Sequence, residues 1–330
     1  MKLILNSNND PAVNLALEEY CVRNLDVENE MYLLFYINKP SVIIGKHQNT
    51  IEEINKQFVD KNGIQVVRRI SGGGAVYHDF GNMNFSFITK YSPEFFHNFE
   101  KFTKPLVETL REMGVEAELG GRNDIVVGGR KISGNAQFTN LKSMFSHGTL
   151  LFNSNLDDVV QALNVKMDKI ESKGIKSVRS RVANISELLS ESITIHDFKE
   201  RITNSIFKEY ESLPLYILTD SEWEKVHKLS EQKYRTWEWN FGRSPEFNVQ
   251  KVNRFEFGQI DVRIFVKDGE IQEIKFYGDF LGYGDSEDVE NKLKGVLFKD
   301  EEVESVLKNT DLKYYFGNIE LKDFVKFICD

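Results

Sequence analysis

The order of apolar and polar positions predicts alternating strands and helices in the first part of the chain. Continuous apolar runs such as "MYLLFYI" and "SVIIG" are typical of buried strands, and "NFSFITK" alternates like a strand with one covered face. A helix is expected after Asp10, because an aspartate followed by a proline favours a helix start. Further helices are predicted over "TIEEINKQFVDKNG", ending at Gly63, and over roughly Glu94 to Met113.

The middle of the chain carries four more predicted strands, "VEAEL", "NDIVV", "RKISGNAQ" and "HGTLLFN". Gly128 and Gly129 separate the second from the third, and two glycines between strand-like runs predict a tight hairpin. From 155 to 233 the pattern is mostly helical. The first part of the chain therefore predicts a mixed, largely antiparallel sheet with helices packed against it.

The character of the sequence changes near residue 245, after the aromatic segment "YRTWEWNFGRSPEF". Three strand-like runs follow, "VNRFEFG", "IDVRIFV" and "EIQEIKFY", and Asp268-Gly269 predicts a turn between the last two. Amphipathic helices continue to the C-terminus. We expect an α+β protein with two domains, 1–245 and 246–330, the smaller having three strands with helices on one face.

The composition is that of a folded protein, because 41% of the 330 residues are hydrophobic. No apolar run fits a membrane helix or a signal peptide, so we expect a cytoplasmic protein with no membrane partner. Cys21 and Cys329 suit a reducing compartment and support neither a disulfide framework nor a zinc site. The formal charge of −9 argues against nucleic acid as a partner and favours an anionic small molecule for the locally basic segments.

The first of these basic segments, "RRISGGGAVYHDFGN", begins at Arg68 and contains three consecutive glycines. A backbone without side chains can approach a ligand closely and offer N–H groups to an anion, while Arg69 adds a positive charge. A phosphate or a carboxylate is the ligand that this pattern suggests. Taken alone, three glycines are more often a flexible turn, and neither of the common nucleotide-binding glycine motifs is present.

Two other segments have related chemistry. In "GRNDIVVGGRKISGNAQ", pairing across the hairpin would bring Asp124 close to Lys131, which offers a carboxylate for Mg²⁺ beside an ammonium for phosphate. The alternative is an ordinary cross-strand ion pair, worth about a kcal/mol or less at a surface. In "FSHGTLLFN", His147 precedes an apolar strand, where a single histidine is more often structural than catalytic.

In this order and spacing, the three segments resemble the lipoate-protein ligase family, which shares a fold superfamily with biotin protein ligases and octanoyltransferases. The resemblance extends through "NLALEE", "SVIIGKHQN", "KGIKSVRSRVANI" and "WEWNFGRSP" and covers most of the first 245 residues. Residues 246–330 resemble the accessory domain of two-domain bacterial ligases by layout. The resemblance implies a biotin/lipoate ligase-like catalytic domain followed by a small α+β accessory domain.

For activity, the resemblance implies that lipoate and ATP form lipoyl-AMP and pyrophosphate, after which the lipoyl group passes to a lysine of a lipoyl domain. Lys131 matches the family lysine that touches the α-phosphate and the acyl carbonyl oxygen, and Asp124 is the nearest match for an Mg²⁺ contact. The positions that match contacts to ATP or the adenylate are Arg69, Gly74, Ala75, Val76, Tyr77, Asn123, Asp124 and Lys131.

The resemblance also implies an apolar slot for the lipoyl tail, although its residues could equally be ordinary core. The matching positions are Leu17, Tyr36, Gly73, His78, Lys131 and His147. The acceptors implied are the lipoyl domains of 2-oxo acid dehydrogenase acyltransferase subunits and the glycine cleavage H protein. The sequence identifies no general base for the acceptor lysine.

Two alternatives stay open at this point. An amidotransferase or octanoyltransferase moves acyl groups without ATP through a cysteine thioester, but neither Cys21 nor Cys329 lies in the three segments. A non-catalytic lipoate-binding or carrier-binding protein could keep the fold, although Lys131, Asp124 and the glycine segment argue for catalysis. Because the chemistry found lies before residue 245, we expect the accessory domain to act as a lid required for activation.

Overall fold

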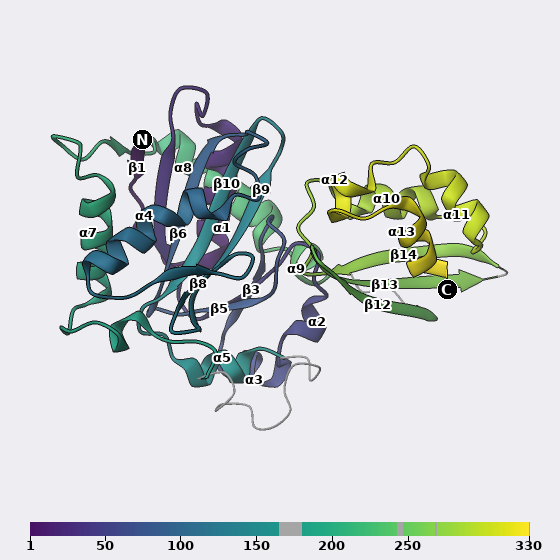
Figure 1. Ribbon diagram of the computed structural model, residues 1–330, viewed down its shortest axis with the longest axis horizontal. Helices are drawn as coiled ribbons and strands as arrows, with labels where there is room; N and C mark the ends of the chain where they lie inside the picture. The colour runs from purple at the N-terminus through teal and green to yellow at the C-terminus, as the bar shows by residue number, and fades with distance from the viewer. Residues whose placement is uncertain (165–179, 243–246, 268, 330) are drawn as a thin grey trace.

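The protein is described from a computed structural model, which places residues 1–164, 180–242, 247–267 and 269–329. Figure 1 shows two bodies side by side, a larger one formed by the first part of the chain and a smaller one formed by its end. Parts of "KGIKSVRSRVANI" and "WEWNFGRSP", and Asp268 of the expected turn, lie outside the described residues. No helix in the described ranges has the length and apolar character needed to span a bilayer.

The larger body is built on an eight-stranded sheet with the strand order β11-β1-β2-β6-β10-β9-β8-β7. The three strands at the β11 edge are parallel and all other neighbours are antiparallel, which confirms the mixed, largely antiparallel sheet. The strands are β1 (Lys2–Ile4), β2 (Tyr32–Ile37), β6 (Asn82–Lys90), β7 (Glu118–Gly120), β8 (Asp124–Val127), β9 (Arg130–Thr139), β10 (Ser143–Leu151) and β11 (Leu215–Tyr216). The short strand β11 falls in the segment expected to be helical, since two residues are too few for a periodic pattern.

A second sheet of three strands, in the order β4-β3-β5, carries the glycine segment. It consists of β3 (Ser41–Ile44), β4 (Gln65–Arg68) and β5 (Val76–His78). The loop from Arg69 to Ala75 therefore connects the two outer strands of this sheet. Strand β3 lies parallel to β4 and antiparallel to β5, so the loop passes over the end of β3.

The described helices of the larger body pack around both sheets, and all of them except α2 begin after a residue whose side chain accepts from free N–H groups. Asp10 accepts from Ala12 N–H at the start of α1, as expected. The predicted helix ending at Gly63 is two helices, because Asn55 interrupts it and caps the second. The helix expected from Glu94 starts at Phe99, capped by Asn98. The α-helices are α1 (Pro11–Asn24), α2 (Thr50–Glu53), α3 (Lys56–Lys61), α4 (Phe99–Glu112), α5 (Leu156–Ala162), α7 (Ile195–Ile206), α8 (Asp220–Leu229) and α9 (Trp237–Phe241).

The eight-stranded sheet has a separate core on each face, as the alternating directions of side chains in strand β2 illustrate. Leu33 and Phe35 enter a core shared with α4 and α7. Leu34 and Tyr36 enter a core shared with α1, a helix whose residues are buried from Pro11 to Val22. The face that carries Tyr36 is the one on which the cavity described below is built.

The smaller body consists of a sheet in the order β12-β13-β14 with helices packed on it. Its elements are β12 (Val249–Phe255), β13 (Gly258–Lys267), β14 (Glu270–Gly278), α10 (Ser286–Leu293), α11 (Asp300–Leu307), α12 (Leu312–Phe316) and α13 (Leu321–Cys329). Figure 1 shows the helices on one side of the sheet, and a core of its own lies between them. This arrangement confirms the small accessory domain of three strands with helices on one face.

Several contacts hold the accessory domain against the larger body, one of them at the glycine segment. The N–H of Gly278 donates to the carbonyl of His47 at 2.8 Å, and the His47 ring stacks on Phe280 with centroids 4.5 Å apart. A Cβ at Gly72 would lie 2.7 Å from the Phe280 carbonyl oxygen, so this position has room only for glycine. Arg122 of the larger body donates through Nη1 to the carbonyl of Phe257 at 2.7 Å.

Candidate active site

A cavity of about 430 Å³ lies between the α1 face of the large sheet, the glycine segment and the accessory domain. Its floor is a row of residues that crosses four neighbouring strands. Thr149 pairs with Asn84 and Asn84 pairs with Tyr36, while Thr149 Oγ1 accepts from the N–H of Gly134. With neighbouring strands about 4.8 Å apart, this row spans about 14 Å from β9 to β2.

The glycine segment is held over this floor by Arg69, which is buried. Its Nη2 donates to the carbonyls of Gly72 and Gly74 at 2.7 and 2.8 Å, and its Nη1 donates to the carbonyl of Ile43 at 3.2 Å. Burial lowers the pKa of Arg69 to about 10, so the guanidinium stays charged at neutral pH. Arg69 therefore fixes the loop and places a positive charge in the cavity wall.

The three glycines answer different demands. Gly72 is packed against the accessory domain, and Gly73 has a φ of +90°, which favours glycine. Gly74 has an ordinary φ, and a Cβ there would meet no atom within 4 Å among the described residues. Gly74 also lines the cavity. Its missing side chain therefore leaves space for a ligand and is not needed to avoid a steric clash within the protein.

The neighbouring Arg68 has a structural task. It is buried, and its Nη1 donates to the carbonyls of Gly45 and Gln48 at 2.9 and 2.7 Å, away from the cavity lining. Its Nε donates to the carbonyl of Trp239 at 2.9 Å. Arg68 thereby ties the loop after β3 to helix α9.

Lys131 and Asp124 form an ion pair of 2.8 Å on the cavity wall, which confirms their expected proximity. Strands β8 and β9 pair across the predicted turn, where Gly128 and Gly129 both have positive φ. A bulge between Ile125 and Val126 shifts the register, so Asp124 faces Gly134. A Cβ at Gly134 would lie 2.7 Å from Lys131 Nζ, which means that glycine lets the lysine side chain reach back over the strand.

His147 of strand β10 also lines the cavity and belongs to a buried hydrogen-bonded chain. Its Nδ1 lies 2.9 Å from a carboxylate oxygen of Glu18, and its Nε2 lies 2.8 Å from Oγ of Ser71. Arg69 Nε donates to the same Ser71 hydroxyl at 3.0 Å. Because Glu18 can only accept when ionised, it orients the imidazole and connects helix α1 to the glycine segment.

The cavity brings most of the predicted site residues together. Those that line it are Tyr36, Arg69, Gly73, Gly74, Ala75, Val76, His78, Asn123, Asp124, Lys131 and His147. Tyr77 lies outside the lining, with its ring in a different core and its hydroxyl 3.5 Å from Asp158. Leu17 also lies outside, in the core beneath α1, and Leu15 lines the cavity instead.

Sequence reasoning missed several lining residues. For Leu15 a signal existed. Leu15 and Leu17 are two positions apart on a helix, so their side chains point in directions about 200° apart, and only one of them can face a given cavity. For the accessory domain there was no local signal, because its contribution depends on how the two bodies dock. The missed residues are Leu15, Ile43, Asn84, Arg122, Gly134, Asn135, Ala136, Gly148, Thr149, Arg254, Phe255, Glu256 and Asp279.

Neither cysteine takes part in the cavity lining. Cys21 is fully buried in α1, and burial raises the pKa of its thiol, which opposes formation of the nucleophilic thiolate. Cys329 ends helix α13 in the accessory domain. The described residues also contain no group of three or more His, Cys, Asp or Glu side chains arranged to hold a metal ion.

The sequence matches two protein-family models. The lipoyl protein ligase A/B catalytic domain matches residues 10–207, and the bacterial lipoate protein ligase C-terminus matches residues 244–328. Lipoate-protein ligase LplJ of Bacillus subtilis is 56% identical over 99% of this chain and 100% of its own length. The chain belongs to the lipoate-protein ligase family.

Solved structures of ligases have the same architecture. Plasmodium falciparum LipL1, in complex with lipoate, superposes with a TM-score of 0.78 at 25% identity, covering 98% of this chain and 97% of that one. A lipoate-protein ligase A bound with ATP superposes with a TM-score of 0.63 at 27% identity, covering 73% of this chain and 98% of that one. These similarities agree with the biotin/lipoate ligase-like fold expected from the sequence.

Proposed function

We propose that this protein activates lipoate with ATP to give lipoyl-AMP and pyrophosphate, and then transfers the lipoyl group to a lysine of a lipoyl domain. One observation carries the proposal: a single cavity joins an apolar slot at Leu15, Tyr36 and Ile43 to the glycine segment and the Lys131–Asp124 pair. Two similar structures contain lipoate and ATP respectively. An acid and a nucleotide could therefore meet in this cavity.

In activation, a lipoate carboxylate oxygen attacks the α-phosphorus of ATP, and pyrophosphate leaves. Lys131 is assigned the catalytic role, because an ammonium between two approaching anions reduces their repulsion and stabilises the charge that develops in the transition state. Asn123 and Asp124 are assigned to the nucleotide. The glycine segment from Gly73 to Tyr77 would wrap the adenylate, with Tyr77 contributing through its backbone because its ring is buried elsewhere.

A magnesium ion could be held at this site by only one or two protein ligands. Mg²⁺ in nucleotide sites is commonly held by one or two carboxylates together with phosphate oxygens and water. Asp124 lines the cavity and is one-third exposed, so it could contribute one such oxygen, and no larger acidic cluster among the described residues is needed. The ion would neutralise phosphate charge during adenylate formation.

In transfer, the neutral amine of the acceptor lysine forms a C–N bond to the lipoyl carbonyl carbon. The bond between this carbon and the phosphate oxygen breaks, AMP leaves with its electron pair, and the amine proton passes to solvent. The mixed anhydride is reactive enough that no protein nucleophile is required. Lys131 would stabilise the oxyanion on the carbonyl oxygen. The proposed acceptors are lipoyl domains of 2-oxo acid dehydrogenase acyltransferase subunits and the glycine cleavage H protein.

The two alternatives have less support. A cysteine-dependent amidotransferase would need a thiolate at the cavity, whereas Cys21 is enclosed in the α1 core and Cys329 lies in α13. A binding protein without activity would have no use for the Lys131–Asp124 pair on the cavity wall. Transfer without ATP, or lipoate binding without turnover, would favour one of them.

The division of the chain at residue 245 is also proposed, together with a cytoplasmic location where ATP is supplied. Support for the division comes from the core between Ile260 and Ile328, which is separate from the other cores. Support for the location comes from the two cysteines, which form no disulfide.

The test is to incubate the purified protein with lipoate, Mg-ATP and an apo lipoyl domain, and to measure the mass of the acceptor. A lipoyl mass increase that depends on ATP is expected, with lipoate-dependent exchange of pyrophosphate into ATP in the absence of acceptor. Modification without ATP would overturn the ligase proposal in favour of an amidotransferase. If neither pyrophosphate exchange nor modification of the acceptor occurs, the ligase proposal is wrong and the non-catalytic binding protein is the remaining alternative.

A further inference from the structure

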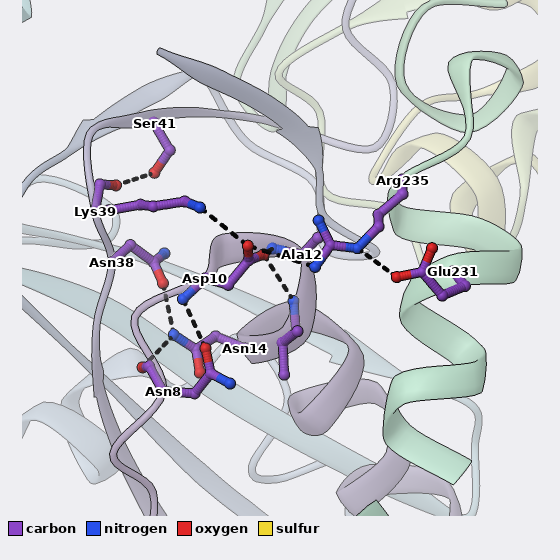
Figure 2. A network of polar contacts seen from close by, with 10 residues as sticks. Asn8, Asp10, Ala12, Asn14, Asn38, Lys39, Ser41, Glu231 and Arg235 are labelled. Atoms are coloured by element: carbon purple, nitrogen blue, oxygen red, sulfur yellow. Dashed lines mark hydrogen bonds and ion pairs between the residues drawn. The ribbon is translucent and has the colours of Figure 1, made fainter. Parts of the chain in front are cut away.

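A chain of asparagine side chains fixes the tautomer of His78, which lines the cavity. Asn14 Nδ2 donates to the carbonyl of Asn8 at 2.9 Å and to Oδ1 of Asn38 at 2.7 Å, as Figure 2 shows. The oxygen of Asn38 therefore faces Asn14, and its Nδ2 lies 3.0 Å from His78 Nδ1. Since an amide nitrogen only donates, Nδ1 must accept, and the proton of the neutral ring is on Nε2.

This Nε2–H group is buried and has no hydrogen-bond partner among the described residues. His78 is 3% exposed, and burial, together with the nearby Arg69 and His147, lowers its pKa to about 3. The ring is thus a neutral donor at physiological pH. Buried donors are nearly always paired in native proteins, so an unpaired one in a cavity wall points to a ligand acceptor.

The position of His78 tells which part of a ligand it meets. Asn38 directly follows strand β2, so its partner His78 lies near the β2 end of the floor, where Tyr36 stands. Lys131 Nζ lies over Gly134 on β9, at the other end of the row. A substrate whose carboxylate reaches Lys131 would therefore present its tail to His78.

The chemistry at this end favours a weak acceptor on an apolar tail. Leu15, Ile43 and Tyr36 line the same cavity and suit hydrocarbon. A neutral imidazole N–H suits an uncharged acceptor. The dithiolane ring of lipoate has this character, because it is largely apolar and its sulfur atoms accept weak hydrogen bonds.

We propose that His78 Nε2–H donates a hydrogen bond to a dithiolane sulfur, and that this contact makes the protein prefer lipoate over octanoate. The inference rests on the proposed ligase function. Octanoate has the same carboxylate but no ring sulfur, so it leaves the buried donor unpaired. Sites built to hydrogen-bond a substrate reject analogues that lack the partner, and they do so more strongly than apolar pockets reject a change of size.

The experiment measures kcat/KM for lipoate and for octanoate, with ATP, by pyrophosphate release. His78→Leu removes the donor at similar volume, and we expect about a tenfold loss with lipoate and a change within about twofold with octanoate. His78→Gln keeps an N–H donor and should retain most of the preference. Ile43→Leu changes the apolar wall without touching a donor and should affect both acids alike.

Parallel losses with the two acids in His78→Leu would overturn the specificity role and leave His78 as a wall of the slot. The tautomer can be read in the wild-type protein by long-range ¹⁵N–¹H correlation of the imidazole. We expect the proton on Nε2 and a shift of that nitrogen on adding lipoate but not octanoate. A proton on Nδ1, or the same shift with both acids, would overturn the inference whether or not the variants fold.

The proposed function fails in a different way. If the wild-type protein forms an adenylate from neither acid, the ligase reaction itself is refuted. If it uses both acids with ATP and has equal kcat/KM for them, the ligase proposal stands and only the role of His78 is lost.

Discussion

The two ends of the cavity are built on opposite plans. At the β2 end, Asn38 is fully buried, and a chain of asparagine side chains holds His78 in place. At the β9 end, the side chains of Lys131 and Asp124 are 38% and 34% exposed and pair mainly with each other.

This difference separates recognition from chemistry. Buried, fully oriented groups at the β2 end are ready before a ligand arrives, and their hydrogen bonds contribute to folding stability. An exposed ion pair contributes about 1 kcal/mol or less to stability, so its residues can change partners when substrate binds. Substitutions at the β9 end should therefore reduce activity, whereas those at the β2 end should change stability and selectivity.

The largest effect is expected at the β9 end. Lys131→Ala should lower lipoyl-AMP formation by about 10²- to 10³-fold, because one positioned donor to the developing charge is lost. Its melting temperature should stay close to that of the wild type, since the ion pair is exposed. Lipoate-dependent pyrophosphate exchange and thermal unfolding measure the two quantities.

The matched control is Arg130→Ala, which removes a charge from the adjacent position of β9, outside the cavity lining. It should exchange pyrophosphate nearly as well as the wild type. Near-normal exchange in Lys131→Ala would show that the catalytic role was assigned to the wrong residue.

A smaller effect is expected where the glycine segment meets the accessory domain. Gly72→Ala places a Cβ against the Phe280 carbonyl, so it should push the accessory domain away and slow activation about tenfold or more. Transfer from supplied lipoyl-AMP should be less affected, because Lys131 and the slot stay in place. The two half-reactions are assayed separately.

Gly74→Ala sharpens this comparison, since its Cβ meets no described atom and can only occupy ligand space. It should raise the KM for ATP without disturbing the domain contact. Equal slowing of both half-reactions in Gly72→Ala would refute the idea that the accessory domain serves activation alone.

At the β2 end the expected effect is on stability. The folded pKa of His78, about 3, lies below its ordinary 6.5, so between these values the unfolded chain binds the extra proton. Stability from this group is therefore complete above pH 6.5 and lost as the pH falls toward 3. From pH 7.5 to 5.5 the loss should be about 1 kcal/mol.

Urea unfolding of the wild type and of His78→Leu at both pH values isolates this contribution, because other titrating groups are common to the two proteins. The wild type should lose about 1 kcal/mol more than the variant. The same pH dependence in both proteins would mean that His78 is not kept neutral by burial.

The smallest effect on activity is expected for a double substitution of Cys21 and Cys329 by serine. Neither residue lines the cavity, so ATP-dependent lipoyl transfer should stay near the wild-type rate. Cys21→Ser can lower stability modestly, because it puts a hydroxyl in the core below α1. An acyl-thioester trapped on Cys21 would contradict the ligase reading.

The sequence predicted those parts of the site that depend on local pairing. The Asp124–Lys131 pair followed from a hairpin with Gly128-Gly129 at its turn, and the glycine segment followed from composition. Leu17 was expected in the slot, but Leu15 lines it in the structure. A family match locates the helix, whereas the rotation of the helix about its axis decides which side chain faces the cavity.

Other features depend on contacts between distant parts of the chain. Arg254 and Asp279 reach the cavity only because the accessory domain docks there, and no local pattern near them signals a site. The asparagine chain from Asn8 to His78 joins a loop, helix α1, the residue after β2 and strand β5, so its partners cannot be read from spacing. The side chains of β2 alternate between two cores, but the sequence shows only a continuous apolar run, which predicts a buried strand and not which core each residue enters.

The row from Gly134 to Tyr36 has a consequence for the length of the acid that the cavity accepts. A substrate that lies across strands rather than along one is measured in steps of the strand spacing, about 4.8 Å each. Backbone hydrogen bonds set that spacing, so side-chain substitutions hardly alter it. The strand spacing thus fixes the length of the acid that fits between Gly134 and Tyr36. In relatives with the same row, a different residue at the Tyr36 position would change which tail is recognised, while the length of the acid would stay the same.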